Sequence, residues 1–191
     1  MSHSFRTICW IPTWNPDHGN VGIEHLLLSD GQADGVVIAV DPDAGPFRLC
    51  YRLKWDAQWR LRGAGLSLAV DDGGPPRSLH LKTDGEGHWQ DERGQPLREL
   101  DGCLDIDIWP TPFTNSLPIR RAPLKVGERR EFRMAWIDGT TLAVRAQAQA
   151  YTRLDDRLYR FESLDGSGFQ AELPVDDERL VIDYPGLFKR L

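Results

Sequence analysis

Apolar and polar residues alternate along most of this chain, and this alternation limits the possible folds more than any other feature. Between residues 48 and 55 every odd position is apolar or aromatic, and every even position except Cys50 is basic. Residues 59–62 alternate in the same way after a turn at residues 56–58. Side chains on a β-strand alternate between two faces, so this segment predicts a hairpin with one apolar face and one basic face. A helical period is nearly absent.

Glycine and proline separate the alternating segments. The chain contains 18 Gly and 13 Pro, and several Asp-Gly pairs mark tight turns, at residues 30–31, 34–35, 84–85, 138–139 and 165–166. Between the turns the sequence predicts strands at residues 7–11, 24–29, 35–40, 48–55, 59–62, 66–70, 79–82, 103–109, 131–137, 142–151, 158–163, 169–175 and 180–184. The predicted fold is therefore mainly β, with a large antiparallel sheet that must curl, split or close.

One long segment departs from this pattern. Residues 110–123 contain four prolines, and residues 116–121 within them predict a short helix or an extended plug. The whole chain has 191 residues, which suits a single domain over residues 1–191. A chain of this length can bury a sizeable core without disulfides or metals.

The charge balance and the cysteine count argue against several classes of protein. With 23 basic and 29 acidic residues the net charge is −6, which disfavours nucleic-acid binding and docking on anionic lipid. Three distant cysteines predict reduced thiols. The histidines lack zinc-ligand spacing and no nucleotide-binding glycine loop is present, so neither metal nor cofactor is expected. The N-terminus lacks a signal-peptide pattern and no apolar run reaches membrane-spanning length, which favours a soluble, cytoplasmic protein.

Two carboxylates share one face of the predicted strand 103–109. Asp105 and Asp107 are two positions apart, so their side chains lie about 7 Å apart, a separation found in inverting glycosidases. Alternatively, they form a solvent-facing acidic stripe or pair with arginines of a neighbouring strand. Arg120 and Arg121 follow. One of these guanidinium groups can hold an anionic or sugar headgroup bidentately, or can form an ion pair with either carboxylate.

The predicted strand 142–151 has one face of small apolar side chains and one polar face. Three alanines at alternate positions leave space above the sheet, which can hold a ligand or an aromatic side chain from another layer. On the opposite face, Gln147, Gln149 and Tyr151 can form hydrogen bonds with sugar hydroxyls or with solvent. A large curved sheet can enclose a cavity on either of these faces.

The chain resembles a bacterial glycolipid-binding family that was formerly a domain of unknown function. The resemblance rests first on the string DGCLDIDIWPTPFTNSLPIRRAPL, which begins at Asp101. Further segments fit in order: GIEHLLL at 22–28, FRLCYRLKWDAQWRLR at 47–62, GEGHWQD at 85–91, QAYTRL at 149–154 and VIDYPGLFKRL at 181–191. The resemblance implies one long antiparallel sheet wrapped into a half-barrel or barrel. It also implies a relationship to LolA/LolB-like and mycobacterial lipoprotein carriers, which hold acyl chains in an apolar cavity.

We therefore predict non-enzymatic binding of a glycolipid or related amphiphile. The acyl part is expected between sheet and plug, where each buried methylene contributes about 0.8 kcal/mol, and the headgroup is expected at the cavity mouth. The headgroup candidates are Asp105, Asp107, Thr114, Asn115 and Arg120. The apolar candidates are Tyr51, Trp55, Phe113, Trp136 and Tyr159. The alternatives are a carbohydrate- or ester-processing enzyme that uses Asp105 and Asp107, and a structural or protein-interaction module.

Overall fold

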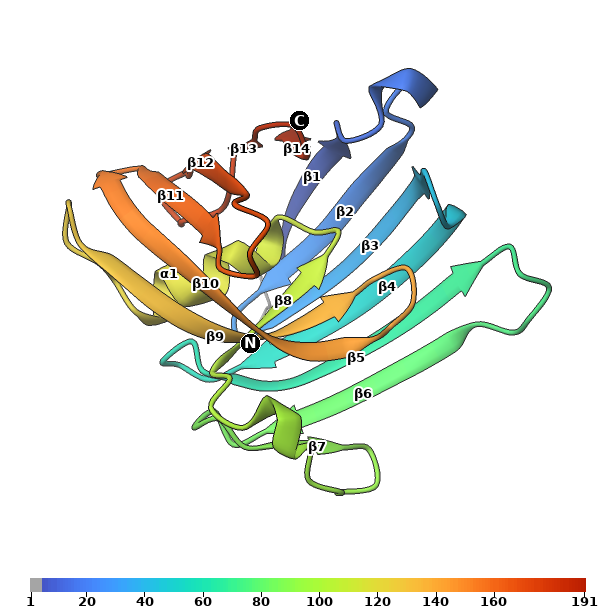
Figure 1. Ribbon diagram of the computed structural model, residues 1–191, viewed down its shortest axis with the longest axis horizontal. Coiled ribbons are helices and arrows are strands. Elements are labelled where there is room, and N and C mark those ends of the chain that lie inside the picture. The colour runs from blue at the N-terminus through green and yellow to red at the C-terminus, as the bar shows by residue number, and fades with distance from the viewer. Residues whose placement is uncertain (1–4) are drawn as a thin grey trace.

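The computed structural model describes residues 5–191, which form two β-sheets and short helical segments (Figure 1). Sheet A contains, in spatial order, β13 (Asp183–Tyr184), β14 (Phe188–Arg190), β1 (Arg6–Pro12), β2 (Gly22–Ser29), β3 (Gln32–Asp41), β4 (Gly45–Trp55), β5 (Leu61–Val70), β6 (Arg77–Thr83) and β7 (Trp89–Asp91). Sheet B contains β12 (Gln170–Pro174), β11 (Leu158–Ser163), β10 (Val144–Asp155), β9 (Arg129–Asp138) and β8 (Asp105–Trp109). The helical segments are η1 (Pro16–His18), η2 (Arg98–Leu100), η3 (Phe113–Asn115) and α1 (Ser116–Arg121).

The mainly β fold class is confirmed, with a large antiparallel sheet, a curled second sheet and one short α-helix. The structure refines the expected single sheet, because the strands are divided between sheets A and B. Neighbouring strands run antiparallel except β8 and β9, which are parallel, with Asp105 opposite Met134. Parallel neighbours need a long crossover connection. Residues 110–128 supply it, and they carry η3 and α1.

The η3–α1 segment (residues 113–121) contacts both sheets. The ring of Phe113 lies 6.5 Å from that of Tyr51 and 6.0 Å from that of Trp55, both on β4 of sheet A. On the other side, Asn115 Nδ2 donates a hydrogen bond of 2.8 Å to the hydroxyl of Tyr151 on β10 of sheet B. The predicted helix at residues 116–121 therefore occupies the interior between the sheets.

The alternation of apolar and polar residues at 48–55 agrees with the burial of their side chains in the structure. On β4 the odd-numbered residues from Phe47 onward are buried, whereas most even-numbered residues are exposed. The side chains of Leu49 and Leu53 are fully buried. The apolar face of this strand therefore points into the core between the sheets, as the period of two predicts.

Two short strands lie outside the predicted set. β7 has only three residues, and β14 pairs with β1 so that Arg190 lies opposite Trp10. The predicted strand at residues 180–184 is reduced to Asp183–Tyr184. Strands this short carry too few positions for a periodic pattern, and their pairing partners are far away in the sequence. Among the described residues no helix has the length and apolar character needed to cross a membrane.

Gly35 on β3 makes room for the ring of Tyr51, and this contact gives a first prediction. A Cβ at position 35 would overlap the ring and hydroxyl of Tyr51, so Gly35→Ala is expected to lower the free energy of unfolding by about 2–3 kcal/mol. Urea denaturation measures the change. Gly65→Ala is the matched control, because its nearest neighbour would be the exposed His80 ring at 3.4 Å. Equal stability of the two variants would contradict this account.

Candidate functional site

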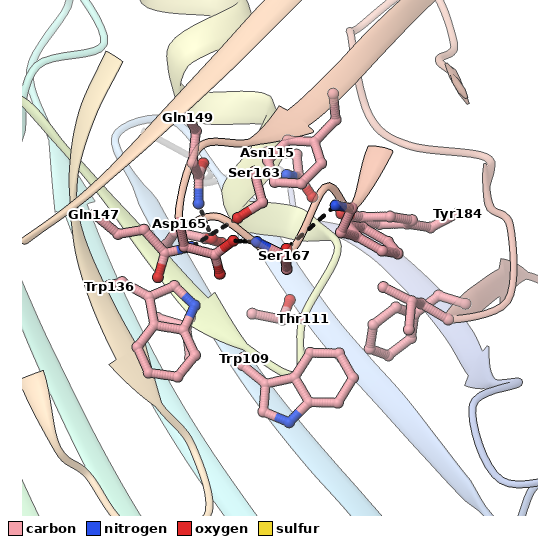
Figure 2. Close-up of a pocket in the computed structure, with 16 residues that line it drawn as sticks. Trp109, Thr111, Asn115, Trp136, Gln147, Gln149, Ser163, Asp165, Ser167 and Tyr184 are labelled. Carbon is pink, nitrogen blue, oxygen red and sulfur yellow. Dashed lines mark hydrogen bonds between the residues drawn. The ribbon is translucent and has the colours of Figure 1, made fainter. Parts of the chain in front are cut away.

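A pocket of about 270 Å³ lies beside sheet B, and we call it the Trp109 pocket. It is formed by β8 to β11, the loop before β12, and the C-terminal strands of sheet A (Figure 2). Its lining residues are Asp107, Ile108, Trp109, Thr111, Asn115, Trp136, Gln147, Gln149, Phe161, Ser163, Asp165, Ser167, Phe169, Tyr184, Leu187 and Phe188. Segments from the middle and from the end of the chain therefore meet here.

Six aromatic side chains give this pocket its walls. The ring of Phe161 lies 6.0 Å from that of Tyr184 and 6.1 Å from that of Phe169. Across the pocket, the indole of Trp109 lies 6.3 Å from the ring of Phe188. Figure 2 shows the indoles of Trp109 and Trp136 beside the polar side chains. Aromatic faces of this kind offer flat apolar surface, on which the C–H face of a sugar or an alkyl group can lie.

Asp107 is the central polar group of the pocket. Its carboxylate accepts a hydrogen bond from Nε2 of Gln149 and another, of 3.0 Å, from Oγ1 of Thr114. Burial raises the pKa of Asp107, and the two hydrogen bonds oppose this rise. Gln149 is itself buried, and its Oε1 has no hydrogen-bond partner among residues 5–191. A buried acceptor without a partner is costly, so it marks a place where a ligand hydroxyl can donate.

Further polar side chains stand around this acceptor. Gln147 Nε2 donates a hydrogen bond of 3.2 Å to the hydroxyl of Ser163. Asp165 lies in the loop before β12, and hydrogen bonds from Ser167 lower the pKa of Asp165 to about 2. The pocket therefore combines an ionised carboxylate near the surface with a desolvated carboxyl on its floor. Both can accept hydrogen bonds from a polyhydroxylated ligand.

Asp105, the other candidate carboxylate, does not line this pocket. Its carboxylate is fully buried and accepts hydrogen bonds from Nε of Arg121 at 2.9 Å and from Nη2 at 2.6 Å. The ion-pair interpretation of the sequence therefore applies to Asp105 and Arg121. Because Asp107 alone faces the pocket, the two carboxylates do not flank a common cavity.

The ten candidate residues are distributed over three environments. Those that line the Trp109 pocket are Asp107, Asn115 and Trp136. Those that line a second cavity, beside α1, are Trp55 and Arg120. The others are packed in the interior: Tyr51, Asp105, Phe113, Thr114 and Tyr159. These ten residues therefore do not form a single site, because the η3–α1 segment places Asn115 and Arg120 on different cavities.

On β10 the polar face lines the pocket. Gln147 and Gln149 point into it, whereas Ala148 on the opposite face is exposed. The space above the three alanines is therefore not this pocket. The wall residues Phe161, Phe169, Tyr184 and Phe188 were missed by the sequence reasoning. The only sequence signal for the last two was their place in the C-terminal segment that carries the family resemblance.

Within the described part of the chain, no cluster of three or more His, Cys, Asp or Glu side chains is arranged to hold a metal ion. The Trp109 pocket is lined mainly by hydrogen-bonding and aromatic side chains. The fold and this pocket define a protein of two packed β-sheets with an aromatic and amide-lined pocket at the edge of the interior.

Residues 12–190 match the family described as "Putative glycolipid-binding", and the chain belongs to this family. A solved structure with the same fold is the crystal structure of a DUF1089 family protein from Pseudomonas aeruginosa. It is 53% identical, with a TM-score of 0.85, and the match covers 88% of this chain and 91% of that one. No curated protein matches the chain. The relationship to LolA/LolB-like carriers stays a prediction.

Proposed function

We propose that the Trp109 pocket binds the sugar headgroup of a glycolipid or of a related amphiphile, without catalysing a reaction. The observation that carries the proposal is the unpartnered Oε1 of Gln149, which is buried among aromatic walls. The family's description supports the same ligand class. A volume of about 270 Å³ lies near the lower end of small-molecule pockets, which suits a headgroup rather than a whole lipid.

The acyl part then has to lie outside the pocket, which departs from the expected deep apolar cavity. Phe169 at the rim keeps 38% of its surface exposed, and the partly exposed Leu187 also contributes apolar surface there. An alkyl chain that leaves the pocket can cover these side chains, and each methylene removed from water contributes about 0.8 kcal/mol. This arrangement supports recognition of an amphiphile through both of its parts.

We infer a non-catalytic role from the state of the candidate pair Asp105 and Asp107, since Asp165, the third carboxylate, is exposed and held by a hydrogen bond from Ser167. Glycoside hydrolysis needs a pair of carboxyl groups on either side of the scissile bond. Asp105 is engaged by Arg121, and Asp107 already accepts hydrogen bonds from Gln149 and Thr114. The three cysteines are free, which suits a reducing compartment, and we propose the cytoplasm as the location.

Octyl glucoside below its micelle concentration is the probe for this proposal. At a concentration one hundred times its dissociation constant it is expected to stabilise the protein by about 2.7 kcal/mol, which raises Tm by roughly 5–10 °C for a chain of this size. Gln149→Met keeps the side-chain volume but removes the Oε1 acceptor together with the Nε2 donor to Asp107, so it is expected to weaken binding about tenfold. Tryptophan fluorescence follows the titration, because Trp109 and Trp136 line the pocket.

Gln90→Met on β7 is the matched control, since Gln90 is an exposed glutamine of the other sheet. Its affinity for octyl glucoside is expected to equal that of the unaltered protein. The proposal fails if the unaltered protein shows neither a Tm shift nor a saturable fluorescence change, or if both variants bind equally well. Release of free glucose from octyl glucoside, abolished by Asp107→Asn, would instead establish the enzymatic alternative.

A further inference from the structure

A second cavity of about 590 Å³ lies at the opposite end of the η3–α1 segment, and we call it the Arg120 cavity. The turn between β2 and β3, the turn between β4 and β5, and the C-terminal end of α1 enclose it. Its lining residues are Arg6, Leu28, Ser29, Asp30, Gly31, Trp55, Asp56, Ala57, Trp59, Arg120 and Glu178. Neither Asn115 nor any other residue of the Trp109 pocket takes part, so the two cavities are separate.

The guanidinium of Arg120 is held at this cavity with unused donors. Its carbon Cζ lies 4.1 Å from the centre of the Trp59 ring, and only 14% of the side chain is exposed. Nε and Nη2 are buried and make no hydrogen bond with any of residues 5–191. A buried guanidinium normally uses these donors in a fork that matches a carboxylate or a phosphate. Nε and Nη2 of Arg120 therefore form a pair of fixed donors that lacks an acceptor among residues 5–191.

The turn between β4 and β5 fixes the backbone of Trp59, whose N–H donates a hydrogen bond of 2.9 Å to the carbonyl of Asp56. Trp59 has a φ of 60°, in the left-handed region that a bulky side chain rarely adopts. Its indole lies 4.8 Å from the ring of Trp55 and is nearly parallel to it. Trp55, Trp59 and Arg120 thus form one stack. The stack fixes the plane of the guanidinium beside the cavity.

Glu178 is the carboxylate nearest to this guanidinium, and its placement indicates what the cavity accepts. Its Oε2 lies 3.8 Å from Nη2 of Arg120, which is beyond hydrogen-bond distance, and 2.9 Å from Nη1 of Arg6. The side chain of Glu178 is 55% exposed, so it can move into solvent when its ion pair with Arg6 breaks. Arg6 would keep its ion pair with Asp176, at 3.0 Å. The carboxylate of Glu178 therefore lies near the donors of Arg120 without accepting a hydrogen bond from them, and an external anion can take that position.

We propose that the Arg120 cavity is a second binding site, which takes an oxyanion of a small ligand, either a phosphate or a carboxylate. The anion accepts hydrogen bonds from Nε and Nη2 of Arg120 and displaces the carboxylate of Glu178 towards solvent. The other acidic side chains that line the cavity are Asp30, which is exposed, and Asp56, which already pairs with Arg60 and Arg62 and so does not compete for Arg120. The site is independent of the proposed headgroup pocket.

Side-chain NMR of the full chain tests this site. Sodium phosphate and sodium acetate are titrated separately, and sodium chloride keeps the ionic strength constant. The Arg120 Nε–H and Trp59 indole N–H signals are followed. At least one anion is expected to shift both signals saturably. Glu178→Gln removes the competing charge and is expected to tighten binding at least threefold. Saturation by phosphate alone would indicate a phosphate-bearing ligand, and saturation by acetate would indicate a carboxylate.

Two further variants separate the site from general charge effects. Arg120→Gln is expected to abolish the saturable shift of the Trp59 indole signal. Arg130→Gln, which removes an exposed arginine paired with Glu128, is expected to leave the affinity unchanged. The proposal is overturned if neither anion gives a saturable shift with the unaltered protein and with Glu178→Gln, or if Glu178→Gln binds no more tightly. Glu178→Gln is expected to leave octyl glucoside binding unchanged. A negative result for the anion site would therefore not contradict the proposed headgroup pocket.

Discussion

Replacing Arg121 with methionine is expected to lower the free energy of unfolding by about 3–5 kcal/mol, because it leaves a buried carboxylate without its counter-ion. Asp105 is fully buried, and Arg121 is the cation that holds it, with distances of 2.9 and 2.6 Å. Burial raises the pKa of Asp105, and Arg121 opposes the rise. Without Arg121 the carboxyl must take up a proton in the folded state, so the loss of stability should grow as the pH rises.

Urea denaturation at pH 5 and pH 8 measures both parts of this prediction. Arg130→Met is the control, because Arg130 is an exposed arginine whose pair with Glu128 contributes at most about 1 kcal/mol. The double variant Asp105→Leu with Arg121→Met removes both charges and is expected to recover most of the stability. If Arg121→Met were as stable as Arg130→Met, the pair would not be a structural element of the fold.

The second large effect concerns Glu24, which is buried in sheet A. Its Oε1 accepts hydrogen bonds of 2.5 Å from the hydroxyls of Tyr51 and Thr111, while Oε2 has no partner among residues 5–191. Burial raises the pKa of Glu24 to about 8. At neutral pH the folded protein therefore keeps a proton that the unfolded chain releases. Stability is therefore lost as the pH rises from the pKa of Glu24 in the unfolded chain towards its pKa of about 8 in the fold.

From about pH 5 to pH 8, Glu24 is expected to cost the unaltered protein about 1.4 kcal/mol of stability per pH unit. Glu24→Gln carries no titrating group, so this slope disappears and the variant is more stable at pH 7 by about 3 kcal/mol. Urea denaturation at pH 5, 6, 7 and 8 gives the difference between the two curves. Glu86→Gln, at a glutamate that is 72% exposed, should run parallel to the unaltered protein. Parallel curves for Glu24→Gln as well would show that Glu24 is ionised in the fold.

Much of the sheet structure was predictable because it depends on local alternation. The pattern at residues 48–55 located β4, its apolar face and its turn into β5. The strands β7 and β14 were not predictable, because three residues carry no period. β14 exists because the end of the chain returns to pair with β1. Long-range pairing of this kind leaves no trace in a local window.

The candidate site was predicted in part for the same reason. Asp107 and Asn115 lie in the segment that carries the family resemblance, and both line the Trp109 pocket. The aromatic walls come from β11, the loop after it, and the C-terminal strands. Their side chains reach the pocket only because sheet B lies against the end of sheet A. No spacing within the sequence relates these residues to Asp107.

The sequence by itself determined that this chain forms strands, where most of them turn, and that each strand has two chemically different faces. A period of two defines two faces but does not say which one is inside. Only the tertiary structure decided that Gln149 faces the pocket while Ala148 faces solvent. It also paired Arg121 with Asp105 and stacked Arg120 on Trp59, 3.8 Å from Glu178, because successive residues of a helix point in different directions.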